Sequence, residues 1–213
     1  MKAGWYVACT TAGGTTGQNH WGSQPAIDDL SNLYDYINTN YTLNGKVVVG
    51  AHSMGNLLTM NALRLGSTAF KNVVDGVIHA GNGVADLDAI FNSGNTSFTS
   101  AICTAYALTC ASCSTAGTAG CSDWVSLTGN YDPVDQAASS WAAYRFYFAT
   151  TSADTLIDRA VHPAALITLI TGNVVSLNSI TGNCNHGDSA CPGSPTRMYV
   201  PAQWLAQAND MTP

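Results

Sequence analysis

Charged side chains are scarce in this sequence. Asp, Glu, Lys and Arg make up only 9% of its 213 residues, and the formal net charge is −6. Because no cluster of Lys and Arg is present to meet phosphates, the sequence argues against a nucleic-acid partner. The surface must therefore be formed largely by Ser, Thr, Asn and Gly.

The sequence also lacks an apolar run long enough to cross a bilayer, so we expect no transmembrane segment. Its first residues, Met1–Trp5, lack the apolar core of a signal peptide. No internal repeat is visible. A chain of this length is expected to form a single domain over residues 1–213, with a full hydrophobic core.

Seven cysteines are present, and most of them are clustered. With the Ser- and Thr-rich, Lys-poor composition, the clustering indicates an oxidising compartment. We therefore expect an extracellular protein whose signal peptide is not part of this sequence. Cys9 has no obvious partner and is interpreted as a buried thiol.

Disulfides are the favoured interpretation of the remaining cysteines. Cys184 and Cys191 are close enough in sequence to close a small loop. Two more disulfides, in any of three pairings, are expected among Cys103, Cys110, Cys113 and Cys121. Zinc is disfavoured there because the outer spacings are irregular and no second C-x-x-C is present, so we expect no metal and no cofactor.

A strand, a sharp turn and a helix surround Ser53. Val47–Val49 is a β-branched run, which is typical of a buried parallel strand. Apolar residues then recur at helical spacing over residues 54–65. Small residues, Ala51 and Gly55, lie two positions before and after the serine, giving an A-x-S-x-G motif. This arrangement predicts a nucleophile elbow, in which the turn lifts the serine hydroxyl clear of the sheet.

Strands and helices alternate on both sides of this turn. We expect further strands at Trp5–Cys9, Val73–His79, Tyr144–Ala149 and Val174–Leu177, and helices over 25–37, 163–170 and 196–207. This order predicts an α/β fold with a mostly parallel sheet and helices on both faces. Over residues 84–143 the alternation stops, and the stretch is interpreted as an inserted, disulfide-stapled cap or lid with an apolar underside.

A serine hydroxyl needs a base within hydrogen-bond reach and a carboxylate to orient that base. His186 is the candidate base, because it lies in a polar loop after the last sheet strand; a structural or surface histidine is the alternative. Asp154 is the favoured acid because it follows the strand that ends at Ala149. Asp132 is the alternative acid, or else a turn former beside Pro133.

Two other histidines lie near the predicted site. His52 precedes Ser53, and because neighbouring elbow residues point apart it is interpreted as a packing residue. His79, near a strand end, is a candidate pocket-lining residue.

The segment Val48–Gly55 resembles the A-H-S-M-G elbow of small bacterial lipases and esterases, and residues 147–157 are similar to the acid-bearing strand and turn of that group. The resemblance implies an α/β-hydrolase fold, here short at its N-terminus and carrying a lid that the smallest members lack. It also implies hydrolysis of carboxylic esters through an acyl-enzyme on Ser53. In that reaction His186 acts as base and then as acid, and Asp154 orients it.

The chain departs from that group in its oxyanion hole. The H-G-x motif that supplies the second donor there is missing. The Met54 N–H is expected to be one donor, and Thr10 or Thr11 is the candidate for the other. Losing one oxyanion donor typically lowers the rate by about 10²–10³-fold, so the absence of the H-G-x motif is expected to affect the rate of the enzyme.

The expected partner is a small-molecule or lipid ester with a hydrophobic acyl group, since the lid is apolar. Two alternatives remain open. The same triad serves thioesterases, amidases and peptidases, which differ in the shape of the pocket. A truncated hydrolase fold with weak catalysis would instead bind a ligand without turning it over.

Overall fold

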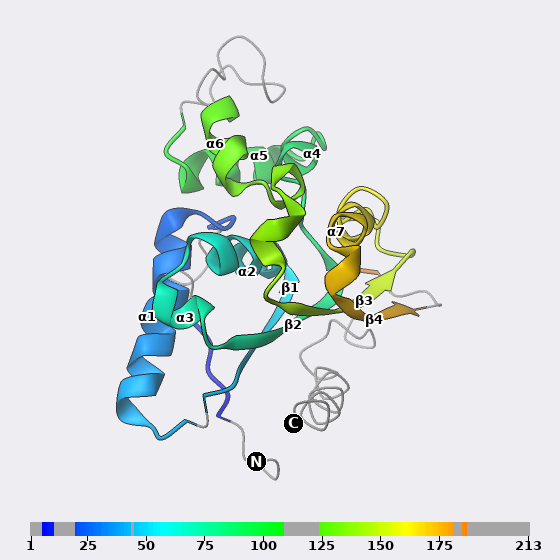
Figure 1. The fold of residues 1–213 in the computed structure, drawn as a ribbon. Coiled ribbons are helices and arrows are strands. Elements are labelled where there is room, and N and C mark those ends of the chain that lie inside the picture. The colour runs from blue at the N-terminus through cyan, green and yellow to red at the C-terminus, as the bar shows by residue number, and fades with distance from the viewer. Residues whose placement is uncertain (1–5, 11–19, 44, 109–123, 181–184, 187–213) are drawn as a thin grey trace.

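A four-stranded parallel sheet forms the centre of the computed structural model, which describes residues 6–10, 20–43, 45–108, 124–180 and 185–186 (Figure 1). The strands lie in chain order: β1 (Val47–Ser53), β2 (Val74–Gly83), β3 (Arg145–Thr151) and β4 (Val174–Ile180). Each strand pairs in parallel with the next one. The expected parallel sheet with helices between its strands is confirmed. Its carboxyl ends lie at one edge, where ligands bind in folds of this kind.

A helix precedes the first strand, and further helices follow each of the first three strands. They are α1 (Gln24–Asn40), α2 (Met54–Leu65), α3 (Thr68–Lys71), α4 (Leu87–Phe91), α5 (Thr96–Ala105), α6 (Trp124–Tyr131) and α7 (Pro163–Leu169). Short 3₁₀ turns span Pro133–Asp135, Ala138–Trp141 and Thr171–Asn173. In Figure 1, α1, α2 and α3 group together, and α7 lies beside β3 and β4.

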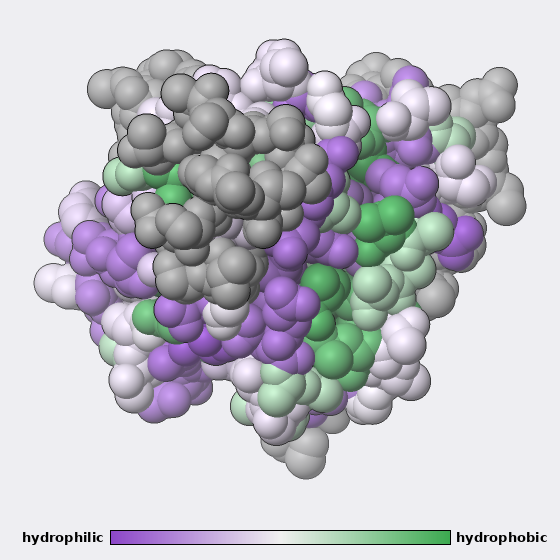
Figure 2. All heavy atoms as spheres, turned by 90° about the horizontal axis from the view of Figure 1, so that it is seen from above, coloured by the Kyte–Doolittle hydropathy of each residue, from purple (hydrophilic) through white to green (hydrophobic). Residues whose placement is uncertain are grey.

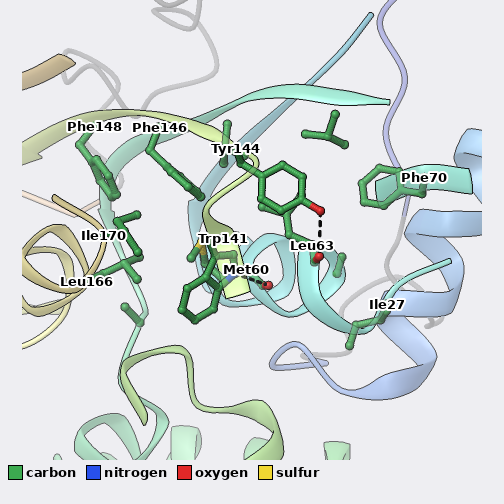
Figure 3. Close-up of a cluster of buried hydrophobic side chains, with 14 residues drawn as sticks. Ile27, Met60, Leu63, Phe70, Trp141, Tyr144, Phe146, Phe148, Leu166 and Ile170 are labelled. Atoms are coloured by element: carbon green, nitrogen blue, oxygen red, sulfur yellow. Dashed lines mark hydrogen bonds between the residues drawn. The ribbon is translucent and has the colours of Figure 1, made fainter. Parts of the chain in front are cut away.

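The main hydrophobic core joins the sheet to these helices (Figure 3). Phe146 and Phe148, two residues apart on β3, present their rings to the same face of the sheet. Two aromatic side chains in this core also satisfy their polar atoms. The Trp141 indole N–H donates to the Met60 carbonyl at 3.2 Å, and the Tyr144 hydroxyl donates to the Leu63 carbonyl at 3.0 Å. The core thereby holds α2, the helix after Ser53, firmly on the sheet.

The segment between β2 and β3 folds into α4, α5 and α6, which lie together in Figure 1. The Trp124 ring packs on Phe91 with centroids 4.1 Å apart, and its N–H donates to the Asp88 carboxylate at 2.6 Å. A second buried cluster joins these helices to Leu57 of α2 and to Ile157. The helices of the expected cap are therefore packed against the elbow helix.

The predicted disulfide-rich character of this segment stays a prediction. Cys103 is disulfide-bonded. The other cysteines for which we predicted bridges lie outside the described residues: Cys110, Cys113, Cys121, Cys184 and Cys191.

The first predicted strand is wrong as far as the structure describes it, because residues 6–9 form no strand. Tyr6 and Val7 are 57% and 81% exposed, so this segment does not bury the apolar side chains that suggested a strand. Cys9 is a free, exposed thiol, which corrects the expectation of a buried one. Trp5 and the helix predicted over 196–207 lie outside the described residues. None of the described helices is both long and apolar enough to span a bilayer.

Candidate active site

Ser53 lies at the sharp junction between β1 and α2. It is the last residue of β1, Met54 begins α2, and the serine backbone has φ 54° and ψ −126°. A positive φ is strained for a residue with a side chain, and it is the conformation that a nucleophile elbow imposes. The Val84 N–H donates to the Ser53 carbonyl at 3.1 Å, which ties the turn to the end of β2. The local geometry thus matches the expected elbow.

His186 bridges the two other residues of the predicted triad. Its Nε2 lies 2.8 Å from the Ser53 hydroxyl, and its Nδ1 lies 2.7 Å from the Asp154 carboxylate. The His186 side chain is 12% exposed and that of Asp154 is 1% exposed. With its proton on Nδ1, the neutral imidazole donates to Asp154 and accepts from the Ser53 hydroxyl, as a general base requires.

The turn around Asp154 directs one carboxylate oxygen toward His186. Oδ1 accepts from the N–H groups of Leu156 and Ile157, each at 2.9 Å. Oδ2 is the atom that meets Nδ1 of His186. One oxygen therefore fixes the carboxylate to its own turn, while the other is directed at the base.

The alternative acid, Asp132, lies elsewhere. Its Oδ2 accepts from the N–H groups of Leu87 and Asp88 at 2.7 and 3.2 Å, and its Oδ1 accepts from the Val134 N–H at 3.3 Å. The side chain thus joins the start of α4 to the turn after α6. Of the two candidate acids, the structure places only Asp154 against His186, and Asp132 has the turn-forming role that was its other interpretation.

Burial shifts the pKa of several groups that are not part of the contacts between Ser53, His186 and Asp154. Burial, and then the neighbouring Asp86, raises the pKa of Asp132 to about 8, against the N–H groups that oppose the rise. Burial also lowers the pKa of His79 to about 3, and that of His162 to about 4. Both histidines are therefore neutral near pH 7.

His79 does not line an open pocket, which corrects the sequence interpretation. Its side chain is only 2% exposed, and its ring stacks on Phe148 with centroids 4.6 Å apart. The strand was expected to end at His79, but β2 continues to Gly83, so His79 lies inside the sheet beside Phe148 and not at the edge where ligands bind.

Sequence reasoning missed three asparagines that connect the loops of the site. Asn185 accepts at Oδ1 from the Thr155 N–H at 3.1 Å, which joins the residue before His186 to the acid loop, the segment 151–157 that carries Asp154. Asn82 of β2 binds the acid loop at both ends. The hydrogen-bond network orients the Asn56 amide so that it donates to the Ala51 carbonyl at 3.0 Å and accepts from the Gly83 N–H at 3.2 Å. Asn56 and Asn82 are buried within a helix and a strand, where asparagine is unusual, whereas Asn185 is exposed beside the candidate base; no spacing in the sequence links any of the three to its partners.

Of the predicted oxyanion donors, Met54 lies within the described residues and Thr11 does not. Met54 is the first residue of α2, so its N–H is among the helix-terminal groups that have no partner within the helix. This is where a donor next to the nucleophile belongs. Thr11 lies outside the described residues, and the second donor stays a prediction.

No protein-family model matches the chain, and no curated protein matches its sequence. Solved structures do resemble it. A variant of prolyl oligopeptidase B from Galerina marginata, bound to a 35mer hydrolysis and macrocyclization substrate, has 16% identity and a TM-score of 0.58, covering 84% of this chain and 24% of that one. The acylaminoacyl peptidase of Pyrococcus horikoshii has 12% identity and a TM-score of 0.57, covering 87% and 27%.

A puromycin-hydrolyzing peptidase of Mycobacterium tuberculosis is a third example, with 14% identity, a TM-score of 0.54 and coverage of 86% and 25%. Likeness at these identities establishes the fold, so the chain has an α/β-hydrolase-like architecture. The chain spans about a quarter of the length of these structures.

Proposed function

We propose that this protein is a serine hydrolase that cleaves carboxylic acid derivatives through an acyl-enzyme on Ser53. The observation that carries the proposal is the bridge formed by His186, which contacts the Ser53 hydroxyl and the buried Asp154 carboxylate at 2.8 and 2.7 Å. This is the geometry that makes a serine hydroxyl nucleophilic near neutral pH.

The reaction has two halves. In the first, Ser53 Oγ attacks the carbonyl carbon while His186 Nε2 accepts the hydroxyl proton, and the Met54 N–H faces the developing oxyanion. The tetrahedral intermediate then collapses as His186 returns the proton to the leaving group, which leaves an ester on Ser53. In the second half, water attacks that ester while His186 accepts its proton; the bond from the acyl carbon to Ser53 Oγ then breaks, His186 returns the proton to Oγ, and the carboxylic acid departs. Asp154 keeps the imidazole in the required tautomer throughout.

We propose that the bond cleaved is an amide or peptide bond and not a carboxylic ester. Support comes from the resembling structures, which are named as a prolyl oligopeptidase, an acylaminoacyl peptidase and a puromycin-hydrolyzing peptidase. The lipase and esterase interpretation rests on the sequence resemblance of the A-H-S-M-G elbow and of residues 147–157. Hydrolysis of an amide and hydrolysis of an ester proceed through the same acyl-enzyme on Ser53 and differ in the leaving group.

Hydrophobic side chains near the acid suggest one property of the substrate. Leu156 and Val161, which follow Asp154 in the same loop, are 45% and 38% exposed. Figure 2 shows hydrophobic residues gathered in a band on one face of the molecule, between hydrophilic regions. The exposure of Leu156 and Val161 beside the acid supports a substrate with an apolar side chain or acyl group.

A fluorophosphonate probe tests the nucleophile. We expect covalent labelling of the wild type at Ser53 and none of the Ser53→Ala variant. Asp154→Asn should label far more slowly, because the base loses its orienting carboxylate. Labelling that is absent from the folded wild type would instead support a hydrolase fold that only binds its ligand.

A matched set of substrates tests the leaving group. One apolar acyl group is presented as an ester, a thioester, a p-nitroanilide and a short peptide, and each rate is divided by the uncatalysed rate of the same compound. We expect the greatest acceleration for the anilide or peptide, with every activity lost in Ser53→Ala. Acceleration confined to the ester would overturn the peptidase form and restore the esterase form.

A further inference from the structure

Asn82 is a buried side chain near the carboxyl end of β2, and it is only 1% exposed. Its Nδ2 donates to the Thr151 carbonyl at 2.9 Å and to the Ile157 carbonyl at 2.8 Å. Its Oδ1 accepts from the Thr151 N–H at 3.0 Å. One amide therefore binds the chain on both sides of the turn that carries Asp154.

The two points that Asn82 holds define that turn. Thr151 is the last residue of β3, and Ile157 lies three residues after Asp154. The N–H of Ile157 is also one of the donors to Asp154 Oδ1. Ile157 is therefore bonded to Asn82 through its backbone carbonyl and to the Asp154 carboxylate through its backbone N–H. Oδ2 is then left facing Nδ1 of His186.

The chemistry of an amide suits this place. It supplies the two donors and the acceptor that the backbone groups need, and it adds no charge beside the Asp154 carboxylate. Removing it leaves two buried carbonyls and one buried N–H without that partner, and such groups are costly to leave unsatisfied. The turn would then move to find new partners, and Asp154 would move with it.

We propose that Asn82 is a positioning residue for the acid of the triad. It acts through Asp154 and touches no reacting atom. The proposal rests on the serine hydrolase function proposed above. Because a displacement of about 1 Å at a catalytic group can cost about 10²-fold in rate, Asn82→Ala should lower kcat by about that factor while KM changes little.

Asn61 offers a matched control. It is also a fully buried asparagine, and its Nδ2 also donates to two backbone carbonyls, those of Gly22 and Tyr131, at 3.1 and 2.9 Å. These partners lie outside the acid loop. Asn61→Ala should therefore lower the unfolding temperature much as Asn82→Ala does, while its kcat stays within about threefold of the wild type.

A double-mutant cycle with Asp154→Ala separates positioning from general damage to the fold. Without a carboxylate to position, Asn82→Ala should lower kcat no further in the Asp154→Ala background. A loss of kcat that is equally large in both backgrounds would overturn the inference. If Asn82→Ala does not fold, Asn82→Ser, whose hydroxyl retains part of the bonding, replaces it in the same cycle.

The failure of this inference and the failure of the proposed function give different results. If Ser53→Ala keeps its turnover, the proposed function is wrong. If Ser53→Ala is inactive while Asn82→Ala and Asn61→Ala have the same kcat, the function stands and the positioning role of Asn82 is wrong. Concentrations of folded enzyme are taken from circular dichroism, so that a smaller folded fraction is not counted as a lower kcat.

Discussion

The imidazole of His52 stacks on that of His186, with ring centroids 4.9 Å apart and planes inclined by 28°. Burial, and then His186 itself, lowers the pKa of His52, while Asp154 raises it by a smaller amount. Because its pKa is lowered, His52 is neutral near pH 7. A neutral aromatic ring thus covers one face of the imidazole that must accept a proton during catalysis, which refines its interpretation as a packing residue.

Removing this stack should slow the reaction without abolishing it. In His52→Ala, the imidazole of His186 loses the surface that limits its rotation, and we expect kcat to fall by about tenfold. His52→Phe keeps an aromatic ring without a titratable nitrogen, and should retain most of the activity. The measurement is kcat for both variants, normalised to the fraction of Ser53 that a fluorophosphonate labels.

The comparison of the two variants identifies what His52 contributes. If His52→Phe is as slow as His52→Ala, a ring nitrogen is needed and the stacking explanation is wrong. If both variants are as fast as the wild type, Asp154 and Ser53 alone hold the base in place.

The two candidate acids should respond differently to removal of their charge. Asp154→Asn keeps the size of the side chain but removes the carboxylate from Nδ1 of His186, and loss of this orienting charge is expected to lower kcat by about 10⁴-fold. Asp132→Asn retains one oxygen, which can still accept from the N–H groups of Leu87 and Asp88, and should keep kcat within about tenfold because Asp132 does not contact His186. The measurement is kcat of both variants on a substrate whose turnover requires Ser53. A larger loss of kcat in Asp132→Asn than in Asp154→Asn would make Asp132 the acid.

The sequence was most informative where the pattern is local. A β-branched run, a turn of small residues and a helical repeat predicted the elbow, and the structure has β1 and α2 on either side of Ser53. The same logic failed at Trp5–Cys9, where a short apolar run resembled a strand but leaves Val7 81% exposed. Short apolar runs do not specify a strand unless tertiary packing buries them.

Local sequence patterns could not predict contacts between residues that lie far apart in the sequence. Asp132 and Asp154 both sit in turns that suit an acid, and only the three-dimensional path of the chain brings one of them to His186. Asn82 and Ile157 are 75 residues apart in sequence, yet their bond helps to hold the acid turn. An asparagine in such a place has no spacing that would reveal its partners.

The stability of the protein should depend on the ionisation of Asp132. Its pKa is raised to about 8 in the folded protein, mainly by burial, from an ordinary value of 3.8. The folded state therefore holds this proton more tightly than the unfolded chain does. The contribution of Asp132 to stability is greatest at low pH and is lost as the pH rises from about 4 to about 8.

Asp132→Asn removes this titration while keeping a side chain of the same size. The unfolding free energy of the variant minus that of the wild type should rise with pH over this range, by at most about 1.4 kcal/mol per pH unit. Urea unfolding at pH 5, 6, 7 and 8 measures the difference. A difference that does not change with pH would mean that the N–H groups of Leu87, Asp88 and Val134 keep the carboxylate ionised throughout.

Gly83 should tolerate no side chain, because Asn56 occupies the space that a Cβ would need. A Cβ at position 83 would lie 1.5 Å from the end of the Asn56 amide and 2.5 Å from Cβ of Asn56, so the whole asparagine side chain would have to move. Asn56 would then lose its bonds to the Ala51 carbonyl and the Gly83 N–H. Overpacking and lost hydrogen bonds together should make Gly83→Ala less stable by about 3 kcal/mol or more.

Gly55 provides the control within the elbow itself. A Cβ there would meet only the Ala51 Cβ at 3.7 Å, which is an ordinary contact. Since alanine is favoured over glycine in a helix by about 0.5–1 kcal/mol, Gly55→Ala should be as stable as the wild type or slightly more so. Urea unfolding of both variants tests this contrast. If Gly83→Ala is as stable as Gly55→Ala, Asn56 is not fixed between β1 and β2, and the elbow must be held mainly by the bond from Val84 to Ser53.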